Sequence, residues 1–222
     1  AFFNKLVSWL GLFFFVLAAY MIYRQLSKYS LQGLKDALFS IPHINLFYAT
    51  AASFIGYIAL STYDYLALKY IKKKLAAWKW ILTGFVGFSV SNNAGHAIVS
   101  GGAVRYRFYS RWGVSPADIV KMVTFSGFTY LVACFFLIII GYVLTPEHAF
   151  GGNDSTKMST FITMVLSVIG ILIYLWASLY YKRDFVIKGV NFAMPNFKLA
   201  LEQIFIGSID IVMASLVLYS VL

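Results

Sequence analysis

Charged residues are scarce in this sequence. They make up 12% of the 222 residues, whereas hydrophobic residues make up 61%. A soluble domain carries about 25% charged residues, so this composition excludes an ordinary globular domain. Together with the mean hydropathy of +0.78, it predicts a polytopic membrane protein.

The sequence also lacks the residues of most catalytic and metal sites. Its single cysteine, Cys134, lies in an apolar run and reads as a small buried hydrophobic residue. His43, His96 and His148 are far apart and show no metal-ligand spacing. No hydrolase elbow, phosphate-binding loop or dinucleotide fingerprint is present. We therefore expect no cofactor, no metal and no covalent catalysis by this chain itself.

Basic residues outnumber acidic ones by 18 to 8, which gives a formal net charge of +10. Such a charge could suggest nucleic acid as a partner. Here, however, the basic residues gather at the ends of apolar segments, most densely at Lys72–Lys74. The positive-inside rule and anionic lipids place basic residues at such positions. We expect these charges to face a membrane surface and not a nucleic acid.

The apolar segments predict five transmembrane helices, because a helix needs about 20 apolar residues to cross the hydrocarbon core. The predicted spans are Leu6–Tyr23, Leu46–Leu68, Met122–Leu144, Ser159–Tyr181 and Leu199–Leu222. Ser115, Pro116 and Asp118 predict a helix start before the third of them, with a serine cap, a proline at the first position and an acid in the first turn. Between the first two spans, residues 25–45 predict a short interfacial helix that Pro42 ends.

The stretch between Ile81 and Arg111 is the most unusual part of the chain. Where another span would be expected, residues 89–111 read SVSNNAGHAIVSGGAVRYRFYSR. Polar side chains and glycines at membrane depth are costly unless they face protein or a water-filled cavity. We therefore expect the functional site in this stretch.

This stretch could cross the bilayer, or dip in and return. If it returns, 14 of the 18 basic residues lie on one side, and the other four are Arg24, Lys28, Lys35 and Lys157. If it crosses, 7 lie inside and 11 outside. The positive-inside rule favours the return, with a crossing as the alternative. The predicted fold is an all-α, polytopic membrane helix bundle of about five transmembrane helices plus one re-entrant broken-helix hairpin, residues 81–111, in a single transmembrane domain over residues 1–222.

The polar stretch has the chemistry of a lipid-headgroup site. Asn92, Asn93 and His96 offer amide and imidazole groups within about one helical turn. A helix broken at glycines exposes free N–H groups that attract phosphate, and arginines bind phosphate with two donors. The predicted lipid-binding or translocation residues are Asn92, Asn93, His96, Ser100, Gly101, Gly102, Arg105, Arg107, Tyr109, Arg111, Asp64 and Asp210. The alternative is that they only join neighbouring helices or anchor the interface.

Two acids outside this stretch complete that set. Asp64 lies near Lys69 and could simply be an ion-pair partner at the interface. Asp210 lies deeper in an apolar span, which favours a position facing a cavity.

Three runs of the sequence resemble a known family. Tyr63–Leu68, Ser91–Gly95 and Ser100–Ser110 resemble the N-terminal membrane region of bacterial multiple peptide resistance factor, the lysylphosphatidylglycerol synthase/flippase family. The resemblance covers most of the chain in order. It implies a bacterial inner-membrane module that moves aminoacylated phosphatidylglycerol, such as lysyl-phosphatidylglycerol, to the outer leaflet and so gives resistance to cationic peptides. It also implies phospholipid partners and a dimer.

Two parts of that family's pattern are missing from this sequence. One is a second half-site rich in His, Pro, Gly and Glu, and the other is a soluble aminoacyltransferase domain. We therefore expect a piece of a longer protein. The resemblance extends to a seven-residue subset of the site: Asp64, Asn92, Asn93, Gly101, Gly102, Arg105 and Arg107. The alternative function is the membrane part of a phosphatidylglycerol lysyltransferase, which presents lipid to a separate catalytic domain.

Overall fold

The computed structural model describes residues 20, 23–24, 30–94, 97–145, 154–181, 184–187 and 189–222. The chain forms two compact units, residues 1–47 with Val221 and residues 48–220 with Leu222. In the first unit, α2 (Leu31–Ser40) is the short helix expected before Pro42; its interfacial position stays a prediction. Apart from Tyr20 and Tyr23, the predicted first span lies outside the described residues.

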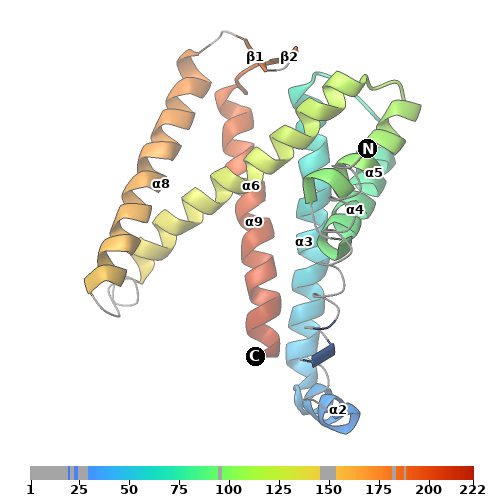
Figure 1. The fold of residues 1–222 in the computed structure, drawn as a ribbon, viewed down its shortest axis with the longest axis vertical. Helices are drawn as coiled ribbons and strands as arrows, with labels where there is room; N and C mark the ends of the chain where they lie inside the picture. Colours follow the sequence, from blue (N-terminus) through green and yellow to red (C-terminus); the bar gives the residue numbers. More distant parts are fainter. Residues whose placement is uncertain are drawn as a thin grey trace, which may run out of the picture. The chain divides into compact units, whose positions relative to one another are not determined.

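The rest of the described chain consists of helices, their short connecting segments and one small strand pair (Figure 1). The elements in order are α3 (His43–Tyr70), α4 (Ala77–Ala94), α5 (Ala97–Arg111), α6 (Pro116–Leu144), α8 (Asp154–Tyr180), β1 (Phe185–Ile187), β2 (Val190–Phe192) and α9 (Phe197–Val221). Among the described residues, α3, α6, α9 and the part of α8 from Lys157 are long and apolar enough to cross a membrane. The prediction of an all-α, polytopic membrane bundle is confirmed.

Helix α6 begins where the sequence predicts. Ser115 is the N-cap, and its side chain accepts a hydrogen bond of 3.2 Å from the amide of Asp118, with Pro116 at the first helical position. Helix α9 begins in the same way, because the Asn196 side chain accepts a hydrogen bond of 2.9 Å from the Leu199 amide. Both caps satisfy backbone donors that a helix start leaves open.

The link between α8 and α9 contains a structure that the sequence analysis missed. Strands β1 and β2 pair antiparallel with Phe185 opposite Phe192, and the two rings stack with centroids 5.9 Å apart. Gly189 has φ 78°, a backbone conformation that favours glycine, in the turn between the strands. The Tyr70 hydroxyl donates a hydrogen bond of 2.7 Å to the Ala193 carbonyl, which ties this link to the end of α3.

Helices α4 and α5 pack against each other as a hairpin (Figure 1). A Cβ at Gly101 would collide with Ser91 Oγ and would lie 3.3 Å from the Gly87 carbonyl oxygen, so the helices approach as closely as glycine allows. The open ends of the pair meet, because the rings of Trp78 and Trp112 lie 5.6 Å apart. The chain therefore leaves and returns at the same end of the hairpin, as the dipping arrangement requires.

Several other helix ends meet at this open end. A core cluster joins the end of α3 to Tyr109 of α5, to the start of α6 and to Leu199 of α9. Lys69 and Glu202 form an ion pair of 2.5 Å, and Lys73 donates a hydrogen bond of 3.2 Å to the Gly113 carbonyl. We call this the basic end of the bundle. Lys69 and Lys73 both lie at this end, and the charge count places both on the same side of the membrane.

Candidate functional site

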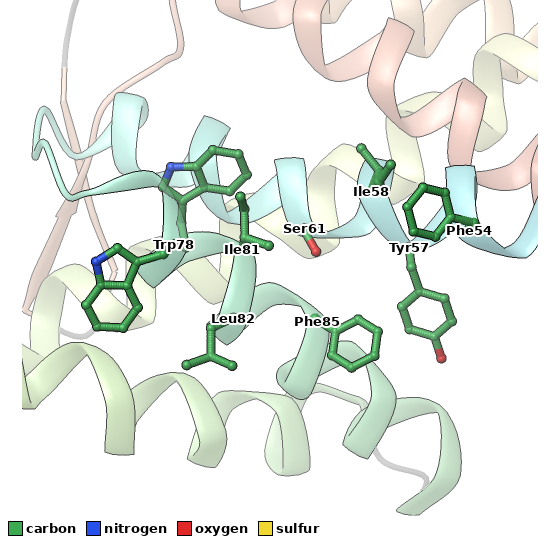
Figure 2. Close-up of a pocket in the computed structure, with 9 residues that line it drawn as sticks. Phe54, Tyr57, Ile58, Ser61, Trp78, Ile81, Leu82 and Phe85 are labelled. Atoms are coloured by element: carbon green, nitrogen blue, oxygen red, sulfur yellow. The ribbon is translucent and has the colours of Figure 1, made fainter.

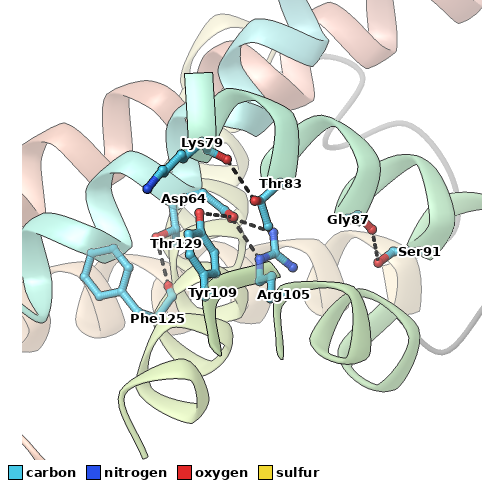
Figure 3. Close-up of polar contacts among 9 residues, drawn as sticks. All are labelled: Asp64, Lys79, Thr83, Gly87, Ser91, Arg105, Tyr109, Phe125 and Thr129. Atoms are coloured by element: carbon cyan, nitrogen blue, oxygen red, sulfur yellow. Dashed lines mark hydrogen bonds and ion pairs between the residues drawn. The ribbon is translucent and has the colours of Figure 1, made fainter. Parts of the chain in front are cut away.

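Asp64 of α3 lies at the centre of a buried polar cluster (Figure 3). The Arg105 Nε donates a hydrogen bond of 2.8 Å to Asp64 Oδ1, and the Tyr109 hydroxyl donates one of 2.8 Å to Oδ2. The side chain of Asp64 is fully buried, and that of Arg105 is 4% exposed. Both carboxylate oxygens are therefore occupied, as a charge removed from water requires.

The guanidinium of Arg105 is enclosed by α4. Its carbon lies 4.5 Å from the centre of the Phe88 ring, and a Cβ at Gly87 would lie 3.7 Å from the same carbon. Nη2 also lies 2.7 Å from Asp64 Oδ1, but it is not aligned for a second hydrogen bond and has no other partner among the described residues. The small residue at position 87 leaves the space that this buried cation occupies.

This cluster shows the partners of three predicted site residues. Arg105, for which we predict a contact with a lipid phosphate, pairs with Asp64 in the structure, and its role toward lipid stays a prediction. The partner of Asp64 is Arg105 of α5 and not Lys69, which pairs with Glu202. Tyr109 is buried in the same cluster, where its hydroxyl donates to Asp64.

A second buried carboxylate, Asp210 of α9, has a different environment. It is 9% exposed, and its Oδ2 accepts a hydrogen bond of 3.0 Å from the Tyr63 hydroxyl. None of the ion pairs among the described residues involves Asp210. Tyr63 and Asp64 are consecutive on α3, and successive helix positions point about 100° apart. Helix α3 therefore presents one residue to α9 and the next to α5.

Close helix packing holds Asp210 in place. One turn before it on α9, a Cβ at Gly207 would lie 2.5 Å from the Ala133 Cβ and 3.0 Å from the Thr129 carbonyl oxygen. A larger residue would push α9 away from α6, because backbone and methyl groups leave no room. Gly207 is thus the residue that lets α9 bring Asp210 up to Tyr63.

Asp210 and Asn92 line the same pocket of about 250 Å³. Its other lining residues are Ala52, Ser53, Gly56, Tyr57, Leu60, Ala214 and Val217. The structure therefore brings together two predicted site residues from α4 and α9. Asp210 has the cavity-facing position that its depth in the sequence suggested, and its role stays a prediction.

The remaining predicted residues do not join either carboxylate cluster. Arg107 and Arg111 are exposed, and Ser100 is half-buried. A Cβ at Gly102 would lie at an ordinary 3.9 Å from Val123. The Asn93 side chain and all of His96 lie outside what the structure describes.

The sequence analysis missed two pockets that share Trp80, one at the basic end and the other extending from there along α3 and α4. A lysine-lined pocket of about 580 Å³ is bordered by Lys69, Lys72, Lys73, Lys74, Tyr65, Leu68, Leu75 and Trp80. An apolar pocket of about 520 Å³ lies between α3 and α4 and is lined by Phe54, Tyr57, Ile58, Ser61, Trp78, Trp80, Ile81, Leu82 and Phe85 (Figure 2). Trp80 borders both. The sequence signal was the lysine run itself, which we used for topology alone.

The local structure explains why the lysines gather there. Lys72 has φ 57°, and the Lys73 amide donates a hydrogen bond of 3.0 Å to the Leu68 carbonyl. This is the left-handed ending that stops a helix and satisfies its last carbonyls. The chain turns sharply at Lys72, and the next two lysines therefore lie beside the end of α3.

A third buried polar group joins α6, α8 and α9. Gln203 is fully buried; its Nε2 donates a hydrogen bond of 2.6 Å to Thr129 Oγ1, and its Oε1 accepts one from the Tyr174 hydroxyl. The sequence gave no signal for it, because the partners lie 29 and 74 residues away. These bonds satisfy both ends of the amide, so the group serves to join helices.

Within the described ranges, no group of three or more His, Cys, Asp or Glu side chains could hold a metal ion.

Comparisons with known proteins place this architecture among inner membrane proteins. The chain is 30% identical over 215 residues to the uncharacterized protein slr0712 of Synechocystis, covering 96% of this chain and 66% of that protein. It is 26% identical over 212 residues to the inner membrane protein YbhN of Escherichia coli, covering 93% of this chain and 64% of YbhN. The chain thus spans slightly less than two thirds of each relative. No family model matches it.

These relatives and the four spans show a multi-pass inner membrane protein. Neither name refers to lysylphosphatidylglycerol or to peptide resistance.

Proposed function

We propose that this chain binds phospholipid at its basic end and moves it across the inner membrane. The observation that carries the proposal is the pair of pockets that meet at Trp80, one lined by lysines and the other apolar. A phospholipid joins an anionic phosphate to apolar acyl chains, so the phosphate suits the lysine-lined pocket and the acyl chains suit the apolar pocket.

The energetics of both pockets suit a phospholipid. Each Lys near an anionic lipid surface contributes about 1 kcal/mol, and Lys72 and Lys74 are exposed beside the pocket. Tryptophans favour the headgroup level of a bilayer, where Trp78 and Trp80 would mark the boundary between the two pockets. The lysine run supplies the phosphate contacts that the buried Arg105 does not.

The hairpin offers a polar route away from this end. A helix rises about 1.5 Å per residue, so Asn92 lies roughly 20 Å along α4 from Lys79. If Lys79 lies at the membrane surface, that distance corresponds to a depth inside the hydrocarbon core, which is about 30 Å thick. A headgroup entering at the lysines would meet these polar groups partway across.

We further propose, from the resemblance of residues 91–110, that the lipid is an aminoacylated phosphatidylglycerol such as lysyl-phosphatidylglycerol. A dimer is part of the same proposal. The outcome in the cell would be a less negative surface and resistance to cationic peptides.

A second function is favoured by the location of the lysine pocket at the end of the bundle. There it could present phosphatidylglycerol to a separate lysyltransferase domain instead of moving the lipid. Cells carrying the intact protein with Lys72, Lys73 and Lys74 changed to Gln separate the two functions. Translocation predicts a constant total of aminolipid with a smaller outer-leaflet fraction, whereas presentation predicts a smaller total.

The direct test uses the protein in liposomes with acyl-labelled fluorescent phosphatidylglycerol and a membrane-impermeant quencher. Changing Lys72, Lys73 and Lys74 to Gln should slow translocation by on the order of tenfold or more, because each lysine contributes about 1 kcal/mol. The control is Lys198→Gln, which removes a charge from the start of α9 and lines neither pocket. Translocation no faster than in protein-free liposomes would falsify the proposal.

A further inference from the structure

We propose that Asp210 is a proton-binding site that couples lipid movement to the proton gradient across the membrane. The coupling rests on the proposed function, whereas the proton site itself rests on the geometry around Asp210. The proton adds to Oδ1, the carboxylate oxygen that does not accept the Tyr63 hydrogen bond, and so neutralises the side chain.

The first step of the argument is a buried charge without a cation. Asp210 is nine-tenths buried in a helix that can span the membrane, with the Tyr63 hydroxyl as its hydrogen-bond donor. A carboxylate at membrane depth is costly unless a cation or a proton neutralises it. The described residues offer it no ion-pair partner. Proton binding removes that cost.

The second step concerns the other titratable groups nearby. From α3 they are Tyr63 and Tyr57, and from α6 they are Tyr130 and Cys134, which interact electrostatically with the Tyr63–Asp210 pair. Phenol and thiol side chains ordinarily keep their protons at neutral pH. Asn92, which faces the same pocket from α4, does not titrate. Within this set, the carboxylate is the group that exchanges a proton.

The third step links the proton to movement. The pocket has Asp210 on one wall and Asn92, near the tip of the α4–α5 hairpin, on another. A charged carboxylate attracts the amide hydrogens of Asn92, whereas a protonated one attracts them less. Proton binding therefore shifts the balance between a hairpin drawn toward α9 and one released from it. A proton that enters from one side and leaves to the other could drive that exchange.

Infrared difference spectroscopy of the protein in liposomes tests the proton site directly. Between acidic and alkaline pH, the wild type should show, separate from the bands of the exposed carboxyl groups, the band of one buried protonated carboxylic acid that appears and disappears. The band should be lost in Asp210→Asn and return, shifted, in Asp210→Glu. Asp118→Asn is the matched control, because that carboxylate pairs with Lys121 at 3.2 Å outside the pocket, and its variant should keep the band. A band absent from the wild type, or unchanged in Asp210→Asn, overturns the site.

Translocation under an imposed pH difference tests the coupling. The wild-type rate should rise several-fold with the gradient, whereas the Asp210→Asn rate should be indifferent to it. A rate in Asp210→Asn that still follows the pH difference overturns the coupling. So does a wild-type rate that follows a Na⁺ difference instead, because Na⁺ would then be the bound cation. If the band titrates as expected but the wild type moves no lipid, the proton site is supported, and the proposed function and its coupling fail.

Discussion

Two buried carboxylates in the described part of the chain differ in their surroundings: Asp64 of α3, and Asp210 of α9, which accepts a hydrogen bond from the preceding α3 residue, Tyr63. Asp64 has a guanidinium on one oxygen and a phenol on the other. Asp210 accepts one hydrogen bond, from the Tyr63 phenol, and lines a pocket. The first is a closed ionic cluster, and the second is an unneutralised charge beside open space.

The difference separates structure from function. A buried ion pair whose oxygens are all occupied resists change, because breaking it leaves a charge without a partner. A carboxylate with one neutral partner can gain or lose a proton without breaking an ion pair. We therefore assign the Asp64 cluster to holding α3, α4 and α5 together, and the proposed mechanism uses the Asp210 pocket as its moving part.

The largest effect is expected when the closed cluster is broken. Arg105→Ala leaves Asp64 buried without its cation, and the expected cost is about 3–5 kcal/mol of unfolding free energy. Unfolding by denaturing detergent in mixed micelles measures it. Replacing both partners, Asp64→Leu with Arg105→Met, should recover most of the loss, because apolar residues can replace a buried pair. A loss below about 1 kcal/mol in the single variant would contradict the assignment.

A smaller effect is expected from the packing that encloses the cluster. In Gly101→Ala the new Cβ would collide with Ser91 Oγ and lie 3.2 Å from Arg105 Nη1; overpacking of this kind costs about 1–3 kcal/mol. Gly102→Ala is the matched control, since its Cβ meets Val123 at an ordinary 3.9 Å. The control should gain up to about 1 kcal/mol from better helix propensity. Equal stabilities of the two variants in the same unfolding assay would show that the hairpin is not packed this tightly.

The smallest effect on stability is expected at the open carboxylate. In Asp210→Asn the side-chain oxygen still accepts from Tyr63 and the buried charge is gone, so the unfolding free energy should change by less than about 1 kcal/mol. The same change at Asp64 removes charge-assisted bonds and should cost at least about 1.5–3 kcal/mol. Similar losses at both positions would remove the distinction between them.

The fold could be predicted from the sequence wherever the signal is local. The apolar runs of α3, α6, α8 and α9 specify their helices by composition, and Ser115 with Pro116 specifies where α6 begins. The charge count also predicts a returning hairpin; α4 and α5 pack against each other as a pair, and their position in the membrane stays a prediction.

Contacts between distant segments could not be predicted in this way. Arg105 lies 41 residues from Asp64, and Asp210 lies 147 residues from Tyr63. From the sequence alone, an arginine next to tyrosines is equally consistent with a phosphate ligand and with one partner of a buried ion pair. Helix packing decides between the two, because glycines at contact points set how close the helices come. The strand pair before α9 was missed for a related reason: three-residue strands are too short to show a period.

Because Tyr63 and Asp64 are consecutive in α3, this helix connects the contact with α9 to the contact with α5. A rotation of this helix about its axis displaces both side chains by the same angle, one against α9 and the other against α5. The Arg105 cluster resists such a turn, because the turn would pull Asp64 away from both of its hydrogen-bond donors. A movement of α9 that turned α3 through the Tyr63–Asp210 contact would therefore also strain the contacts of Asp64 with α5.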